Sequence, residues 1–289
     1  MIHIIVPVHN RSNITNKFAD CLLRQTYQNY NFILVDDGST DDTVESIKKK
    51  IKNLTVLKGN GNLWWAGGVQ LGIDWLKKNI KNKSEIVLIA NDDITFDKYY
   101  LENAKNILKN NERSFLIAGY SNDEEINNLY CFNNKNGRFI QENDANFKAN
   151  CFAMNSTFCQ LNFLEDTGDL RTKLLPHYLA DIEYSFRAIK KGYKVITDKS
   201  LKIIWNTEST GIHEVKEINF FEYLKIVFTK KYSSNPIHWT YFYYLTMQKK
   251  NFFINISFFW IKFILRFFLK LITNNKIEKL LKDLKKNRR

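Results

Sequence analysis

Residues 32 to 42 read Phe-Ile-Leu-Val-Asp-Asp-Gly-Ser-Thr-Asp-Asp, and this stretch decides the fold. The apolar run Phe32–Val35 predicts a buried strand, because a short run of large and β-branched residues is bounded here by turn residues. The residues from Ser39 to Asp41 are good N-cap residues, which predicts a helix over Asp42–Ile51. A strand that leads through a short polar turn into a helix is the first half of a βαβ unit.

The same alternation extends over residues 1–120. Short runs rich in β-branched residues predict five strands: Ile2–Val8, Phe32–Val35, Thr55–Leu57, Glu85–Ala90 and Phe115–Ala118. Amphipathic stretches between them predict four helices: Thr15–Gln25, Asp42–Ile51, Val69–Lys78 and Tyr99–Lys109. This order is typical of an α/β fold, Rossmann-like, with a mixed and mainly parallel sheet flanked by helices.

The polar, Asn-rich segment 121–150 predicts a surface excursion or a hairpin. The chain then predicts a helix over Asp181–Lys190 and strands over Tyr193–Thr197 and Leu201–Trp205. We therefore expect the α/β domain to end near residue 213.

The formal net charge of +13 is concentrated after that point. Residues 214–289 hold 16 Lys and Arg against 5 Asp and Glu, a net charge of +11, which leaves +2 for residues 1–213. The same tail holds 18 of the chain's 42 Phe, Trp and Tyr residues. We expect residues 214–289 to form a helical, basic and aromatic extension that binds a membrane or a partner.

The four cysteines follow no zinc-like spacing, and we interpret them as small buried hydrophobic residues. The chain enters its first predicted strand without the charged segment and long apolar run of a signal peptide. The expected compartment is therefore the reducing cytoplasm.

Polar side chains follow three of the predicted strands where each strand ends. These segments are Val6 to Arg11, Asp36 to Ser39 and Asn91 to Asp93. In an open α/β sheet, ligands bind outside the carboxyl ends of the strands, so we expect these groups at one rim. Crowded carboxylates repel one another unless a cation lies between them, and Mg²⁺ shared with a diphosphate meets that need. Each motif alone is also typical of a simple turn, and their combination favours a nucleotide site.

These motifs and the later segment Asp181 to Arg187 resemble family 2 glycosyltransferases of the GT-A fold. The resemblance covers about residues 1–213. It implies a nucleotide-binding half over 1–120 and an acceptor-binding half over 121–213.

The resemblance also implies roles for single residues. Asp37 corresponds to the residue that binds the nucleotide base, and Asp92 to one that faces the ribose and diphosphate. The triplet Asn91-Asp92-Asp93 corresponds to the family's Asp-X-Asp element, in which Asp93, together with Asp92, coordinates Mg²⁺ or Mn²⁺. The other residues implied in nucleotide-sugar binding are Pro7, Val8, His9 and Arg11.

A glycine-dense segment, residues 59–72, precedes a predicted helix, so its backbone amides, including that of Gly67, are candidates for binding the diphosphate. The segment resembles a subgroup that includes rhamnosyltransferases of bacterial surface polysaccharides, which often have Asn at the position of Gln70. Trp64 and Trp65 are candidates for stacking on a sugar or nucleotide, with core or lid packing as the alternative.

Inverting transfer needs a base that removes the proton of the acceptor hydroxyl. In the family, a Glu-Asp pair at the start of a helix supplies it, and this chain has Ala180-Asp181 there. We expect Asp181 to be the catalytic base, while Ala180 replaces the usual Glu. Glu183 is a candidate acceptor residue, with an i,i+4 ion pair to Arg187 as the alternative.

Three further side chains are weaker candidates. Many relatives have a metal-binding His after the last core strand, where this chain has Asn206. His213 is the candidate substitute, with a solvated loop histidine as the alternative. His177 precedes the Asp181 helix and is a candidate for contact with an acceptor sugar.

The tail segment 251–273 predicts a helix with one narrow cationic stripe, because Lys262, Arg266 and Lys270 follow one another at i+4 spacing. The surrounding positions are mostly aromatic or aliphatic, which is typical of a helix lying in a membrane interface. Three cations argue against a spanning helix, which needs about 20 apolar residues with few charges. We therefore expect a peripheral protein at the inner face of the cell membrane, bound through residues 251–289. The alternative is packing on the α/β domain or on a second subunit of a homo-oligomer.

The resemblance thus implies an inverting, metal-dependent glycosyltransferase. Its donor is a nucleoside-diphosphate sugar, with dTDP-rhamnose as a candidate, and its acceptor is a glycan or lipid-linked glycan in capsule, O-antigen or lipooligosaccharide synthesis. A sugar-phosphate nucleotidyltransferase is the alternative enzyme, but that class usually has a glycine-rich loop where this chain has Pro7 to Arg11. A non-catalytic nucleic-acid-binding protein ranks last, because the aromatic residues of the tail form an apolar face rather than alternating with cations along a groove.

Overall fold

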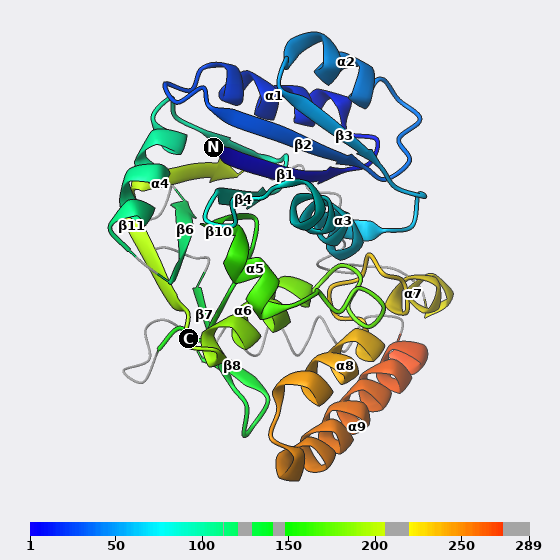
Figure 1. The fold of residues 1–289 in the computed structure, drawn as a ribbon. Helices are drawn as coiled ribbons and strands as arrows, with labels where there is room; N and C mark the ends of the chain where they lie inside the picture. Colours follow the sequence, from blue (N-terminus) through cyan, green and yellow to red (C-terminus); the bar gives the residue numbers. More distant parts are fainter. Residues whose placement is uncertain (112, 121–128, 141–147, 206–219, 274–289) are drawn as a thin grey trace. The chain divides into compact units, whose positions relative to one another are not determined.

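The computed structural model describes residues 1–111, 113–120, 129–140, 148–205 and 220–273 (Figure 1). The chain forms two compact units. The first consists of Met1–Phe132 and Phe139–Ser209, and the second of Asn133–Arg138 and Thr210–Arg289. The domain boundary predicted near residue 213 lies outside the described residues.

The first unit is built on an eight-stranded sheet of the order β3-β2-β1-β4-β10-β6-β11-β5. The strands in this order are β3 (Leu54–Lys58), β2 (Tyr30–Asp36), β1 (Ile2–Val8), β4 (Ile86–Ala90), β10 (Ser156–Gln160), β6 (Ser114–Tyr120), β11 (Lys194–Trp205) and β5 (Ile94–Phe96). β1 pairs in parallel with both β2 and β4, whereas β10 is antiparallel to β4 and β6, and β5 is antiparallel to β11. The predicted mixed, mainly parallel α/β fold is confirmed.

Helices cover both faces of this sheet. They are α1 (Ser12–Leu23), α2 (Thr43–Lys50), α3 (Trp64–Asn79), α4 (Tyr100–Lys109), α5 (Leu161–Thr167) and α6 (Ala180–Lys190). Figure 1 shows α1 and α2 on one face of the strands β1 to β3 and α3 on the other. All the helices and strands predicted before residue 120 are present, with ends shifted by a few residues, and α3 begins five residues earlier than predicted.

The alternation of side chains along β1 explains this layering. Ile2, Ile4, Val6 and Val8 belong to the buried core formed with α1 and α2. The residues between them point to the opposite face, as the pleat requires. There α3 approaches closely, because it has glycine at the contacts: a Cβ on Gly68 would lie 2.7 Å from Pro7 Cβ.

The second half of the sheet departs from the prediction, which also lacks the short strand β5. The runs predicted as separate strands form one strand, β11, whose pairing with β6 shifts register between Thr197 and Lys202. The segment 156–167, for which no element was predicted, forms β10 and α5. Part of the Asn-rich segment forms the hairpin of β7 (Leu129–Asn133) and β8 (Arg138–Ile140), and β7 also pairs with β9 (Cys151–Phe152).

The second unit contains the helices α7 (Phe220–Val227), α8 (Pro236–Thr246) and α9 (Lys249–Thr273). α8 begins at a clear start signal, because the Asn235 side chain accepts a hydrogen bond from Ile237 N and Pro236 occupies the first turn. α8 and α9 lie side by side (Figure 1), joined by the bond from Trp260 Nε1 to Thr240 Oγ1 at 3.0 Å. Within the described residues, no helix is long and apolar enough to cross a membrane.

Candidate active site

Three loops meet at the carboxyl ends of β1, β2 and β4. β1 lies between β2 and β4, where the strand order reverses, and ligands of open α/β sheets bind at such a point. Asn10, directly after β1, ties the first two loops together, since its Oδ1 accepts a hydrogen bond from Thr40 N (2.7 Å) and its N–H donates to Ser39 Oγ (2.9 Å). The segments predicted to form one rim are therefore neighbours.

The acidic triplet after β4 is held by residues that follow β1. The Arg11 guanidinium lies 3.1 Å from Asp92 Oδ1, through Nε, and 3.4 Å from Asp93 Oδ2, through Nη2. Thr15 Oγ1 donates to Asp92 Oδ2 at 2.8 Å. Both carboxylates are buried, so Arg11 supplies a positive charge where two negative charges would otherwise repel.

The two carboxylates differ in what remains available for a ligand. Asp92 has a protein partner on each oxygen, and burial raises its pKa to about 6 although Arg11 and Thr15 favour the ionised form. Asp93 Oδ1 is buried and has no hydrogen-bond partner among the described residues. A carboxylate oxygen with no protein partner beside a second carboxylate fits a divalent cation that takes its other ligands from diphosphate and water. Within the described residues, no group of three or more His, Cys, Asp or Glu side chains is placed to hold a metal by itself.

Asp37 holds the glycine-dense loop. Its Oδ1 accepts a hydrogen bond from Gly61 N at 2.8 Å and its Oδ2 accepts one from Trp64 N at 3.0 Å. The carbonyl oxygen of Asp37 lies 2.8 Å from Nδ1 of the exposed His9. The carboxylate therefore positions the start of α3, and the predicted contact with a nucleotide base requires its remaining lone pairs.

Pro7 and Val8, the predicted site residues before His9, make contacts within the protein. Val8 is 3% exposed, and its carbonyl oxygen accepts a hydrogen bond from Asp37 N at 2.9 Å. Pro7 packs against Gly68 of α3. Their predicted place beside the nucleotide stays a prediction.

The first turn of α3 is joined to two other parts of the site. Trp65 Nε1 donates to Asn91 Oδ1 at 2.9 Å, and Ala66 N donates to Pro176 O at 3.0 Å. The Trp64 ring lies beside His177, with the ring centroids 5.9 Å apart. The structure thus brings together the two tryptophans, His177 and the acidic triplet.

Several backbone amides at the start of α3 donate hydrogen bonds to other groups of the protein. Trp64 N is bonded to Asp37, Ala66 N to Pro176, and Gly67 N to Leu63 O at 3.1 Å. The predicted diphosphate contact of this segment, Gly67 included, stays a prediction. What the structure adds is a packing role for glycine, because a Cβ on Gly72 would lie 2.6 Å from Ile5 Cγ2.

Asp181, the predicted base, lies in the first turn of α6 and is partly exposed. Its Oδ2 accepts a hydrogen bond from Met154 N at 3.3 Å, and the neighbouring Asn155 O accepts one from Asn91 N at 3.0 Å. Two adjacent residues therefore connect the base candidate to the acidic triplet. Burial raises the pKa of Asp181 to about 6, against the backbone hydrogen bonds that favour its ionised form.

Glu183 forms the ion pair that was the alternative to an acceptor contact. Its two carboxylate oxygens lie 2.9 and 3.1 Å from Nε and Nη2 of Arg187. Arg187 also donates to Thr167 O (2.7 Å) and Asp169 O (2.9 Å), so the pair fastens α6 to the loop after α5. Gln70 supports the same loop, because its side-chain oxygen accepts a hydrogen bond from Leu170 N at 2.8 Å.

Three of the four non-glycine residues with left-handed backbone in the described part of the chain lie in this region. Asn10, Trp64 and Leu179 have φ values of 51°, 59° and 69°. They stand directly after β1, at the start of α3 and directly before α6. Such conformations are unfavourable for residues with a Cβ and occur preferentially at functional sites, where the surrounding structure holds them.

Some site residues lie outside the prediction or outside the described residues. Asn206 and His213 are outside the described residues. Thr15 and the carbonyl of Pro176 were not predicted as site residues, although the spacing of Thr15 after Arg11, one helical turn, places both side chains on the same face of α1.

The sheet order and the rim loops define the chain as an α/β protein of the GT-A fold. Solved structures share this fold. A mannosyltransferase from Pyrobaculum calidifontis, in complex with GDP-Man and Mn²⁺, aligns with a TM-score of 0.56 at 16% identity over 73% of this chain and 58% of its own. Staphylococcus aureus TarS (residues 1–349), in complex with UDP-GlcNAc, aligns with a TM-score of 0.52 at 16% identity over 78% of this chain and 64% of its own.

Residues 3–163 match the family described as glycosyl transferase family 2, and the chain belongs to this family. An uncharacterized glycosyltransferase of Rickettsia prowazekii is 32% identical over 136 residues, which cover 45% of this chain and 40% of the relative. Glycosyltransferase GlyG of Streptococcus pneumoniae is 27% identical over 136 residues, or 46% of this chain and 43% of the relative. The chain thus matches less than half the length of these relatives, and Asp181 lies beyond the family match.

Proposed function

We propose that this chain is an inverting, metal-dependent glycosyltransferase that moves a sugar from a nucleoside-diphosphate sugar to a hydroxyl group of a glycan or lipid-linked acceptor. The observation that carries the proposal is the connection between the acidic triplet and Asp181. Met154 and Asn155 are adjacent, and they hydrogen-bond to Asp181 and Asn91. This connection supports a site for the leaving diphosphate and a base for the acceptor within one polar network.

In this mechanism Asp181 accepts the proton of the attacking hydroxyl. A base is most effective when its pKa lies near the working pH, and burial moves the pKa of Asp181 toward that range. The backbone amides of Met154 and Ile182 fix the carboxylate, so that it keeps one orientation toward the acceptor.

Asp93 is the proposed metal ligand, since its Oδ1 has no protein partner among the described residues. Mg²⁺ or Mn²⁺ at this position would neutralise the charge that develops on the leaving diphosphate. Asp92 acts through Arg11: it holds the guanidinium at the rim, where that cation can also face the diphosphate. Asp37 fixes the loop beside the nucleotide base.

The donor is proposed at two levels. A nucleoside-diphosphate sugar is supported by the fold shared with proteins solved with GDP-Man and UDP-GlcNAc. dTDP-rhamnose, and a role in bacterial capsule, O-antigen or lipooligosaccharide synthesis, remain the finer proposal, resting on the residue 59–72 segment of the sequence.

The second unit supports a proposed membrane-surface association. Seven large apolar residues of α9, here called the apolar face, are exposed: Phe253, Ile254, Phe258, Ile261, Ile264, Leu265 and Phe268. An amphipathic helix that exposes such side chains beside cations is suited to a membrane interface. Lys262 is exposed as predicted for the cationic stripe, and the side chains of Arg266 and Lys270 lie outside the described residues.

A panel of nucleotide sugars tests the proposed donor. Thermal unfolding of the full chain with each sugar, with and without Mn²⁺, should give one base-specific stabilisation that depends on the metal. Acceptor-independent hydrolysis of the same sugar then identifies the transferred group. If no nucleotide sugar stabilises the protein under either condition, the proposed function is wrong.

A further inference from the structure

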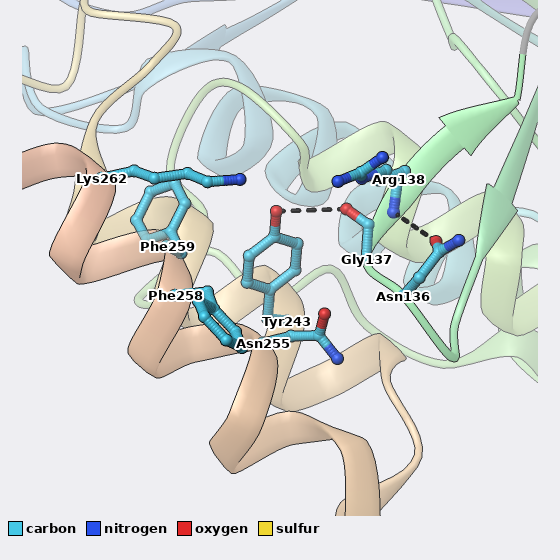
Figure 2. Close-up of a pocket in the computed structure, with 8 residues that line it drawn as sticks. All are labelled: Asn136, Gly137, Arg138, Tyr243, Asn255, Phe258, Phe259 and Lys262. Atoms are coloured by element: carbon cyan, nitrogen blue, oxygen red, sulfur yellow. Dashed lines mark hydrogen bonds between the residues drawn. The ribbon is translucent and has the colours of Figure 1, made fainter.

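The second unit contains a pocket of about 410 Å³ between the β7–β8 turn and the α8–α9 pair (Figure 2). Three hydrogen bonds hold the turn against the helices. Tyr243 Oη donates to Gly137 O (3.2 Å), Asn255 Nδ2 to Lys135 O (3.0 Å) and Gln248 N to Asn134 O (3.2 Å). The walls of the pocket are thus held together by hydrogen bonds to three main-chain carbonyl oxygens of the turn.

Two cations line this pocket. Arg138 comes from the turn and Lys262 from α9, and Figure 2 shows both side chains directed toward the side of the pocket on which the Tyr243 hydroxyl lies. Both residues are exposed, and neither has an ion pair with an acidic side chain among the described residues. Two cations that converge without a carboxylate between them repel each other, and an anion placed between them removes that repulsion.

Asn136 and Asn255 add polar groups to the lining, whereas the side of the pocket formed by phenylalanines is apolar and continues onto the surface. Phe258 and Phe259 form the wall on the α9 side, and Phe258 is also a member of the apolar face. A ligand that fits both the two cations and the apolar wall has a negatively charged group joined to an apolar chain. A free sugar or a soluble nucleotide has no apolar chain to cover that face.

The composition of the second unit favours a membrane lipid as the source of this ligand. Residues 220–273 contain eight Lys and Arg and a single acidic residue, Glu222. Such a surface is attracted to anionic headgroups, while the exposed apolar side chains lose water when they enter the interface.

We infer that this pocket binds the headgroup phosphate of an anionic phospholipid, held between Arg138 and Lys262 with its acyl chains along the apolar face of α9. The inference rests on the proposed membrane-surface association and adds to it a defined lipid site. It predicts that binding depends on these two cations more than on the total charge of the tail.

Sedimentation of the full chain with lipid vesicles tests this site. The vesicles consist of phosphatidylcholine alone or of phosphatidylcholine mixed with phosphatidylglycerol. We expect the wild type to prefer the mixed vesicles, and the double variant Arg138→Gln with Lys262→Gln to lose at least about 100-fold in affinity, since a charge-assisted hydrogen bond to the phosphate contributes about tenfold or more at each position.

The matched control is Lys249→Gln with Lys250→Gln, which removes the same charge from exposed positions at the start of α9. This variant should lose much less, at most about fivefold for each cation that lies near the anionic surface. An equal loss in both double variants would mean diffuse electrostatic attraction and would overturn the lipid site. Saturation of the pocket by soluble glycerol phosphate, with no preference for anionic vesicles, would overturn it as well.

The test also separates this inference from the proposals on which it rests. A wild type that binds neither kind of vesicle contradicts membrane association itself. Nucleotide-sugar stabilisation, measured on the same variants, should remain at the wild-type level, because both substitutions lie in the second unit.

Discussion

Trp65 Nε1 donates a hydrogen bond to Asn91 Oδ1 across 2.9 Å and joins the start of α3 to the acidic triplet. The two residues are far apart in sequence, and each stands beside a proposed ligand-binding element. Asn91 N is bonded to Asn155 O, so the contact continues toward Asp181. The orientation of the triplet therefore depends on the glycine-dense loop.

Replacing Trp65 by Phe should weaken donor binding while the fold is retained. A smaller aromatic ring remains, but the bond to Asn91 is lost, and a hydrogen bond of this kind contributes about 1 kcal/mol, or about fivefold in KM for the donor. The control is Trp64→Phe, because Trp64 Nε1 donates to Asn62 instead of the triplet. Steady-state kinetics with a varied donor measure both. An unchanged KM in Trp65→Phe would mean that the triplet is positioned without this bond.

Asp93→Ala should abolish the metal dependence of donor binding. The variant lacks the carboxylate oxygen that has no protein partner, whereas Asp92 keeps Arg11 and Thr15. We expect at least about a tenfold loss of affinity with Mn²⁺ and little change in its absence. Titration of the nucleotide sugar by calorimetry, with and without the metal, checks this. Metal-enhanced binding that survives in the variant would assign the metal to other residues.

Asp181→Asn should reduce transfer by about 100- to 10,000-fold and leave donor affinity unchanged. In the wild type, kcat should rise as pH increases through about 6, because the base must be ionised and burial raises its pKa to about 6. The variant should show no such rise. A matched control is Asp169→Asn, which alters an exposed carboxylate. If Asp181→Asn keeps full transfer activity, another group is the base.

The same carboxyl should make stability depend on pH with a defined sign. The folded-state pKa of Asp181 is raised, so the fold binds more protons than the unfolded chain between about pH 4 and 6. The stabilising effect of the neutral form is complete below about pH 4 and is lost as pH rises through about 6. Asp181→Asn should therefore raise the Tm at pH 7.5 by a few degrees and leave it unchanged at pH 4. A Tm increase of equal size at both values would contradict this assignment.

How much the sequence predicts depends on the kind of contact that makes each element. The strands β1, β2 and β4 are predicted because both of their faces are covered, which selects continuous apolar runs. β10 lies in the middle of the sheet but reads Ser-Thr-Phe-Cys-Gln. The buried Ser156 Oγ is bonded to Tyr100 Oη, which is distant in sequence, whereas the buried Thr157 Oγ1 donates to Ala153 O, four residues away. A partner so distant in sequence cannot be predicted from the residues around β10.

In the candidate site, too, the sequence predicts the positions of residues but not their partners. The positions of Asp37, Asp92 and Asp93 at strand ends follow from the sequence, because turn residues end each apolar run. The partners of their carboxylates do not follow, since they come from loops distant in sequence. Gly61 N reaches Asp37, and Arg11 reaches both residues of the acidic pair, only after the sheet has aligned the loops.

Two neighbouring glycines of α3 should respond differently to alanine. A Cβ at Gly68 would lie 2.7 Å from Pro7 Cβ, so Gly68→Ala should destabilise the fold by about 1 to 3 kcal/mol. A Cβ at Gly67 would lie 3.1 Å from the side chain of Leu63, which is a tight contact. The higher helix propensity of alanine stabilises the variant by about 1 kcal/mol and offsets the cost of that contact. Urea unfolding should place Gly67→Ala within about 1 kcal/mol of the wild type. Equal losses in both variants would contradict close packing at Gly68 as the cause.

Glu183→Gln should lower the free energy of unfolding by about 2 kcal/mol, because a buried carboxylate that pairs with Arg187 is replaced by a neutral amide. The variant keeps the acceptor oxygen and the volume, so the loss reports the charge of the pair. The control is Glu45→Gln, which removes one partner of the exposed ion pair with Lys48 and should leave the urea midpoint unchanged. Donor hydrolysis per folded molecule should stay near the wild-type level in Glu183→Gln, since the pair fastens α6 to the loop after α5. A large loss of transfer with normal stability would instead place Glu183 in contact with the acceptor.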